Sequence, residues 1–181
     1  EEQAEQLKAF LKDFAVAGAR LVVSLPRDRL IARQLAIPRV GPAEEPGMVR
    51  FQVMRDLNES PDEVKLDYET ADLPGAADRR VLALLLRIEL FNTWKTIATG
   101  SQLKLGGLSP RLSGLVGLMS DLGPVDEPVA VVAVGGAWSE LVVLLNGKPL
   151  FSRSLNPATG LVQEIRRSLS LYGSQNPETA P

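Results

Sequence analysis

The sequence lacks both cysteine and histidine over its 181 residues. Disulfide bonds are therefore excluded within this chain, as are Cys/His zinc sites and catalysis that depends on histidine. Aromatic residues are also scarce, at 5% of the chain. We interpret Trp94 and Trp138 as core or interface anchors rather than as platforms for nucleic-acid bases. Any catalysis by this chain would have to rely on residues other than cysteine and histidine.

Long hydrophobic runs are missing too. No apolar stretch approaches the roughly 18 residues that a membrane-spanning helix needs, so we expect no direct membrane insertion. The acidic start, Glu1 to Glu5, is not a signal peptide. The net charge of −2 shows no bias toward nucleic acid. We therefore expect a soluble cytoplasmic protein. Because the chain opens without methionine in the middle of a helical pattern, we also expect it to be a piece of a longer protein.

Hydrophobic residues make up 45% of the chain and charged residues 23%, close to the average for globular domains. Hydrophobic periodicity predicts helices at 7–17, 44–57, 90–98, 112–122 and 161–172. It predicts strands at 21–25, 30–37, 64–69, 80–87, 103–108, 129–134, 140–145 and 150–155. This order predicts a mixed α/β (α+β) fold that contains antiparallel hairpins as well as crossovers.

Two hairpins stand out. The strand at 64–69 is followed by a short turn and the apolar strand at 80–87, which predicts antiparallel pairing. Asn146-Gly147 is the strongest turn signal in the chain, because both positions of such a turn require positive φ. It closes the last sheet, 129–155. The Gly- and Pro-rich segment 123–128 is the best candidate for a linker ahead of that sheet.

Gly135-Gly136, ahead of Ser139, is the main candidate for a ligand site. A glycine turn between strands can bring backbone N–H groups close to a phosphate, although a tight turn with no ligand is the alternative. Neither a P-loop nor a dinucleotide-binding motif is present. Arg153 and the pair Arg166-Arg167 are candidates for contacts with a phosphate or an acidic partner, or else are ordinary solvated charges. We predict no complete catalytic site and no metal site within this chain.

Several segments in order resemble the PilM family of pilus assembly proteins. They are the stretch Leu21–Pro38, the helix and strand that follow it up to Glu69, the segment Gly147–Leu155, and the helix segment Glu164–Leu169. The resemblance implies an actin-like (ribonuclease H-like) lobe fragment, similar to the cell-division protein FtsA. On that basis, residues 1–26 end the first actin-like subdomain and 27–108 form an inserted small α+β subdomain. Residues 109–128 are then a connecting helix and linker, and 129–181 begin the second lobe.

The resemblance also implies a function. Members of this family lie at the cytoplasmic face of the inner membrane and bind the short cytoplasmic tail of a membrane partner, PilN. It implies nucleotide contacts at Gly135, Gly136 and Ser139. However, the family has an aspartate where this chain has Ala133, and such a carboxylate helps to hold Mg²⁺ and phosphates. The first phosphate loop should precede residue 1, and the adenosine-binding elements should follow Pro181. We therefore expect no cofactor in this chain, while ATP and Mg²⁺ stay open for the full-length protein.

Three hypotheses remain. The first is a scaffold component of a type IV pilus or type II secretion-like machine with a degenerate nucleotide site. The second is an active actin-fold ATPase whose site is completed by segments outside this chain. The third is an unrelated α+β interaction domain, which a 129–155 sheet without a neighbouring strand from Leu21–Leu25 would favour. A homo-oligomer also stays open, because edge strands exposed by truncation can pair.

Overall fold

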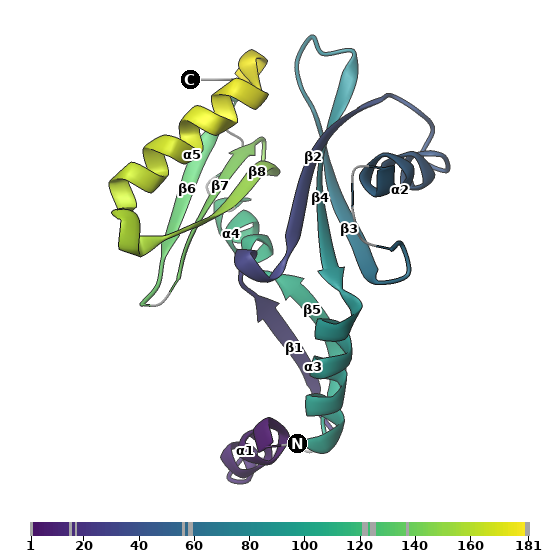
Figure 1. The fold of residues 1–181 in the computed structure, drawn as a ribbon, viewed down its shortest axis with the longest axis vertical. Helices are drawn as coiled ribbons and strands as arrows, with labels where there is room; N and C mark the ends of the chain where they lie inside the picture. Colours follow the sequence, from purple (N-terminus) through teal and green to yellow (C-terminus); the bar gives the residue numbers. More distant parts are fainter. Residues whose placement is uncertain are drawn as a thin grey trace.

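The computed structural model describes residues 2–14, 16, 18–55, 57, 60–120, 123, 126–136 and 138–179 (Figure 1). The α-helices in this part of the chain are α1 (Glu2–Leu11), α2 (Glu45–Arg55), α3 (Ile88–Gly100), α4 (Arg111–Ser120) and α5 (Leu161–Gln175). The strands are β1 (Arg20–Leu25), β2 (Ile31–Pro38), β3 (Val64–Asp72), β4 (Asp78–Arg87), β5 (Lys104–Pro110), β6 (Val129–Val134), β7 (Ser139–Leu145) and β8 (Lys148–Leu155). Short 3₁₀ helices lie at Arg27–Arg29, Pro157–Thr159 and Pro177–Thr179.

The first sheet joins segments that are far apart in the sequence. Strand β1 pairs in parallel with β5, and α3 leads into β5 from the neighbouring sheet (Figure 1). Val23 and Leu25 of β1 are buried together with Leu30, and Trp94 of α3 packs against this cluster. The indole of Trp94 is thus a core anchor, as predicted.

The second sheet has the antiparallel order β2-β4-β3, which confirms the predicted hairpin between β3 and β4. Helix α2 covers one of its faces through the fully buried Val49 and Val53, which contact the sheet residues Ile37, Val81 and Leu85. Apolar residues therefore alternate between two buried faces of β4, which explains why its sequence is apolar almost throughout.

The third sheet, β6-β7-β8, closes on the predicted turn, where Asn146 has φ 50° and Gly147 has φ 71°. Its central strand β7 is buried along its whole length. Tyr172 of α5 lies against Phe151 of β8 in this core, which also takes in Leu73 from the loop after β3. The third sheet therefore packs against the end of the second through β8 and the β3–β4 connection.

The mixed α+β fold class predicted from the sequence is confirmed. Most predicted bounds differ from the observed ones by three residues or fewer, but the first helix was wrong by more: α1 ends at Leu11 and does not continue to 17. The amide of Phe14 bonds back three residues to the carbonyl of Leu11, at 3.0 Å, so the chain turns there instead of adding a helical turn. Ala17 lies outside the described residues, as do Pro124 and Val125 of the predicted linker.

Within the described ranges, no helix is both long enough and apolar enough to cross a bilayer. The third sheet contains no strand from Leu21–Leu25, since β1 pairs with β5 alone.

Candidate functional site

The glycine turn predicted as a phosphate contact lies between β6 and β7. The amide of Gly135 donates a hydrogen bond to the carbonyl of Trp138, at 2.8 Å, and closes the turn. Gly136 is exposed, Ser139 is only 2% exposed at the start of β7, and Ala133 lies opposite Glu140 in the β6–β7 register. The predicted residues therefore share one end of one sheet, but the Ser139 side chain is directed into the core rather than to solvent.

The side chain of Trp138 occupies the space beside this turn. A Cβ atom added at Gly135 would lie 2.3 Å from indole Cε2, so only glycine leaves room for the ring at this place. On the ring lies the guanidinium of Arg111, 3.6 Å from its centroid, in a cation–π contact. The need for glycine at 135 is thus explained by packing of this indole.

Glu140 is the buried charged residue near the turn that the sequence interpretation missed. It is 2% exposed, and its Oε1 accepts hydrogen bonds from the Arg27 amide at 2.8 Å and from Arg111 Nη1 at 3.0 Å. Its Oε2 is buried and has no hydrogen-bond partner in the described part of the chain. The signal available in the sequence was a single acid at the head of the apolar strand Leu141–Leu145.

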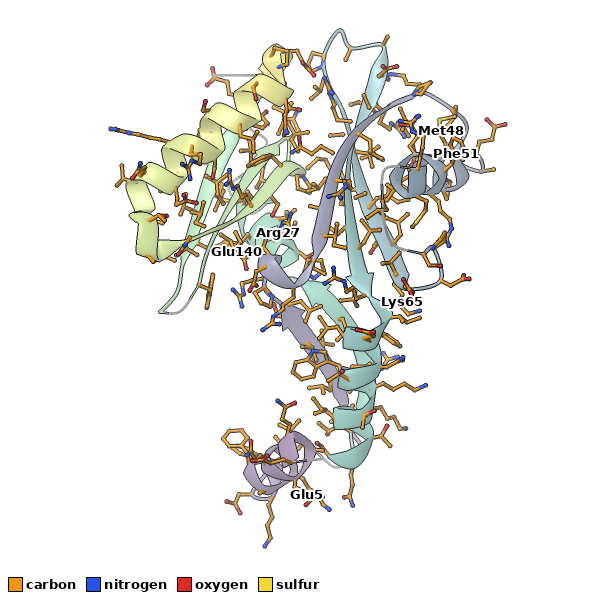
Figure 2. All side chains as sticks on the ribbon, viewed as in Figure 1. Glu5, Arg27, Met48, Phe51, Lys65 and Glu140 are labelled. Atoms are coloured by element: carbon orange, nitrogen blue, oxygen red, sulfur yellow. The ribbon has the colours of Figure 1, made fainter. Side chains whose placement is uncertain are left out.

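Arg27 extends the same network to two further segments. Its Nη1 donates to the carbonyl of Leu30 at 2.6 Å, and its Nε donates to the carbonyl of Ser152 in β8 at 3.2 Å. Burial lowers the pKa of the Arg27 guanidinium, while the nearby charge of Glu140 raises it. Figure 2 shows Arg27 and Glu140 side by side where the three sheets meet. We call Arg27, Arg111 and Glu140 the junction cluster, because they tie the ends of β1 and β5 to the third sheet.

The residues at the turn do not suit a nucleotide with Mg²⁺. Ala133 offers no carboxylate, and Glu140, which shares a face of the sheet with it, already accepts bonds from Arg27 and Arg111. The guanidinium beside it would repel a divalent cation. Among the described residues, no group of three or more Asp, Glu, His or Cys side chains is arranged to hold a metal ion. Glu140 and Arg111 therefore fit a structural ion pair better than a phosphoryl-transfer site.

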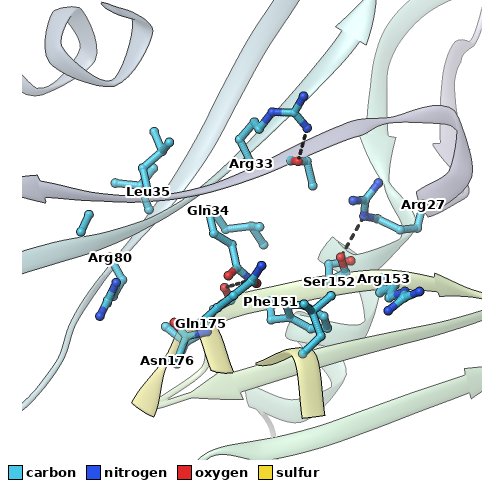
Figure 3. Close-up of a pocket in the computed structure, with 16 residues that line it drawn as sticks. Arg27, Arg33, Gln34, Leu35, Arg80, Phe151, Ser152, Arg153, Gln175 and Asn176 are labelled. Carbon is cyan, nitrogen blue, oxygen red and sulfur yellow. Dashed lines mark hydrogen bonds between the residues drawn. The ribbon is translucent and has the colours of Figure 1, made fainter. Parts of the chain in front are cut away.

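A second feature is a cavity of about 550 Å³ between the second and third sheets (Figure 3). Four arginines contribute to its walls, and no acidic residue does. They are Arg27, Arg33, Arg80 and Arg153. Of the basic residues singled out in the sequence, Arg153 lies at this cavity, whereas Arg166 and Arg167 are exposed on α5. The cavity is lined by Arg27, β2, β4, β8 and the end of α5, and no pattern in the sequence predicts that these segments lie together.

Comparisons with known proteins show what the chain is similar to. A solved PilM–PilN type IV pilus biogenesis complex matches it with a TM-score of 0.71 and 21% identity, over 98% of this chain and 59% of that one. The cytoplasmic domain of EpsL, an inner-membrane component of the type II secretion system of Vibrio cholerae, matches with a TM-score of 0.52 and 11% identity, over 86% and 56%. No protein-family profile and no curated protein matches the sequence.

At these identities the likeness shows the fold. The mixed α+β, actin-like class predicted from the sequence is confirmed, while the subdomain boundaries at 26, 108 and 128 stay a prediction. The chain spans about three-fifths of the length of the solved structures it matches. The separation of β1 from the third sheet had been expected to favour an unrelated domain. That criterion was unsuitable, because a match over 98% of the chain includes both segments in their separate sheets.

Proposed function

We propose that this chain is part of a scaffold protein in a type IV pilus or type II secretion-like machine. In this proposal the protein lies at the inner face of the cytoplasmic membrane and binds the short cytoplasmic tail of a PilN-like membrane protein. The observation that carries the proposal is the likeness to the PilM–PilN complex, with a TM-score of 0.71 over 98% of the chain. The EpsL likeness supports the same class of machine, since that protein is a secretion component.

We further propose that the nucleotide site is degenerate. Support comes from Ala133, which supplies no carboxylate, and from the indole of Trp138, which fills the space over Gly135. The Arg111 guanidinium stacked on that indole adds positive charge where a metal ion would be needed. Tight packing and local charge thus both oppose a Mg²⁺–nucleotide complex at the turn.

Co-purification tests the scaffold half of the proposal. The full-length protein carrying an affinity tag is co-expressed with the PilN-like protein of the same organism, either intact or without its cytoplasmic tail. We expect the intact partner to co-purify and the tailless partner to be lost. Equal recovery of both forms would contradict tail binding, and recovery of neither would contradict the partnership itself.

Calorimetric titration of the full-length protein with ATP and Mg²⁺ tests the proposal that the nucleotide site is degenerate. We expect no binding in the micromolar range. Tight binding with turnover would establish the alternative, an active ATPase completed by segments outside this chain, and would leave the scaffold role untouched.

A further inference from the structure

Helix α2 (Glu45–Arg55) carries the most exposed of the large hydrophobic side chains that the structure describes. Phe51 is 70% exposed, whereas Val49 and Val53 are fully buried against the second sheet. Each of these valines is two positions from Phe51, and helix residues two positions apart point in nearly opposite directions. Phe51 therefore faces away from the sheet. Figure 1 shows α2 on the side of the second sheet that is turned away from the third sheet.

Phe51 belongs to a row of side chains along the outer side of α2. The row has the spacing of one helix face and consists of Glu44, Met48, Phe51 and Arg55. Glu44 directly precedes the helix, and its carbonyl accepts a hydrogen bond from the Met48 amide at 3.0 Å, which places it one turn before Met48. Met48 is half-buried, and the other side chains of the row are exposed. We call these residues the α2 row, which leads from an acid through two apolar side chains to a base.

The surface around the α2 row is preformed. At the start of the helix, Glu45 accepts hydrogen bonds from Arg79 Nη1 at 2.5 Å and from the Tyr68 hydroxyl at 3.3 Å, which fixes α2 to the second sheet. One turn before Phe51, Gly47 leaves the helix surface bare, since no heavy atom lies within 4 Å of a Cβ added there. A partner can therefore approach the helix closely, and little conformational freedom is lost on binding.

The α2 row is complementary to itself in one orientation. When two copies of α2 pack antiparallel about a two-fold axis at the middle of the row, Glu44 lies opposite Arg55 of the second copy. In the same pairing, Met48 lies opposite Phe51 of the second copy. Methionine sulfur packs favourably against aromatic rings, and the opposite charges at both ends attract. Parallel packing would instead set Glu44 against Glu44 and Arg55 against Arg55.

The charged ends of the row are able to make these contacts. Glu44 has no ion pair among the described residues, so the pairing supplies one. Arg55 has an interaction within its own chain. A guanidinium carries five N–H donors, so one such interaction does not prevent a contact with a carboxylate of the second copy.

We propose that the α2 row is a contact surface for a second copy of this chain, which binds it as an antiparallel, two-fold symmetric helix pair. Phe51 and Met48 form the apolar centre, and Glu44 and Arg55 fix the orientation at the rim. One helix of 11 residues per copy gives a smaller contact than the roughly 1,600 Å² of a stable complex. The dimer is therefore transient, with a dissociation constant on the order of 100 µM. The proposal does not depend on the pilus or secretion role.

Sedimentation velocity ultracentrifugation of the 181-residue chain, over about 10 µM to 1 mM, tests this inference. The variants are F51A, E44R and R55E, and far-UV circular dichroism checks that each is folded. F10A is the matched control for F51A, because Phe10 is also highly exposed, at 67%, but lies on α1. E44R and R55E are measured singly and as an equimolar mixture. The mixture sets opposite charges against each other at both ends of the pair, whereas each variant alone sets like charges against each other.

We expect the parent chain to dimerise, F51A to weaken the association at least about fivefold, and F10A to leave it unchanged. E44R and R55E should each weaken the association several-fold, and their mixture should associate as strongly as the parent chain. If R55E does not fold, the comparison of F51A with F10A decides. The inference is overturned if the parent chain stays monomeric over this range, if F51A weakens the association no more than F10A does, or if the mixture associates no better than each variant alone.

Discussion

Replacing Glu140 with alanine is the sharpest test of how the three sheets are held together. This side chain is 2% exposed and accepts from the Arg27 amide at 2.8 Å and from Arg111 Nη1 at 3.0 Å. Truncation removes the one carboxylate oxygen that accepts both bonds, and it leaves a partly buried amide and a partly buried guanidinium without this acceptor.

The expected cost follows from this geometry. Removing one partner of a buried ion pair typically destabilises a protein by about 3–5 kcal/mol. The Arg111 side chain is 22% exposed, so water can recover part of its loss. We therefore expect E140A to lower the free energy of unfolding by about 3 kcal/mol, a large fraction of the roughly 5–15 kcal/mol of a typical domain.

Equilibrium urea denaturation followed by tryptophan fluorescence measures this change. Glu164 provides a matched control, because it is also buried, at 5% exposed, and also pairs with an arginine. That arginine, Arg167, is 63% exposed at 3.3 Å, so the pair should contribute about 0.5 kcal/mol. A loss in E140A that is below about 1 kcal/mol, or no larger than the loss in E164A, would refute the role given to the junction cluster.

Two further predictions concern single residues. G135A should destabilise the chain by about 1–3 kcal/mol and shift the Trp138 emission, because the new Cβ would meet the indole at 2.3 Å. G136A is its control: no heavy atom lies within 4 Å of a Cβ there, so its urea midpoint should match that of the parent chain. Burial raises the pKa of Tyr172, so the folded chain keeps that proton at a pH where the unfolded chain has lost it. The free energy of unfolding should therefore fall as the pH rises above about 10, and it should fall less steeply in Y172F. Urea denaturation of both chains at a series of pH values measures this, and an equal fall in the two chains would contradict it.

Local signals in the sequence were sufficient where the structure is decided locally. Asn146-Gly147 specifies its own turn through positive φ, and the alternation in Val64–Asp72 follows from one buried face of β3. The PilM resemblance, carried by short ordered motifs, led to the correct fold class.

Contacts between distant segments could not be predicted in this way. Arg27 and Glu140 are 113 positions apart, and their hydrogen bond exists only because β1 ends where β7 begins. The space that Trp138 takes over Gly135 depends on a side-chain rotamer, and the cationic cavity depends on how two sheets meet. The end of α1 was misjudged because Phe10 and Phe14 continue the helical spacing, yet they are 67% and 55% exposed and bury too little to extend the helix.

The central claim, that this protein is a scaffold which binds the tail of a PilN-like partner, is tested most directly by calorimetric titration. The full-length protein is titrated with a synthetic peptide of that tail and with a scrambled peptide of the same composition. The account predicts saturable binding of one tail per protein and no heat from the scrambled peptide. Absence of binding to the native tail, or equal binding of the two peptides, would contradict it.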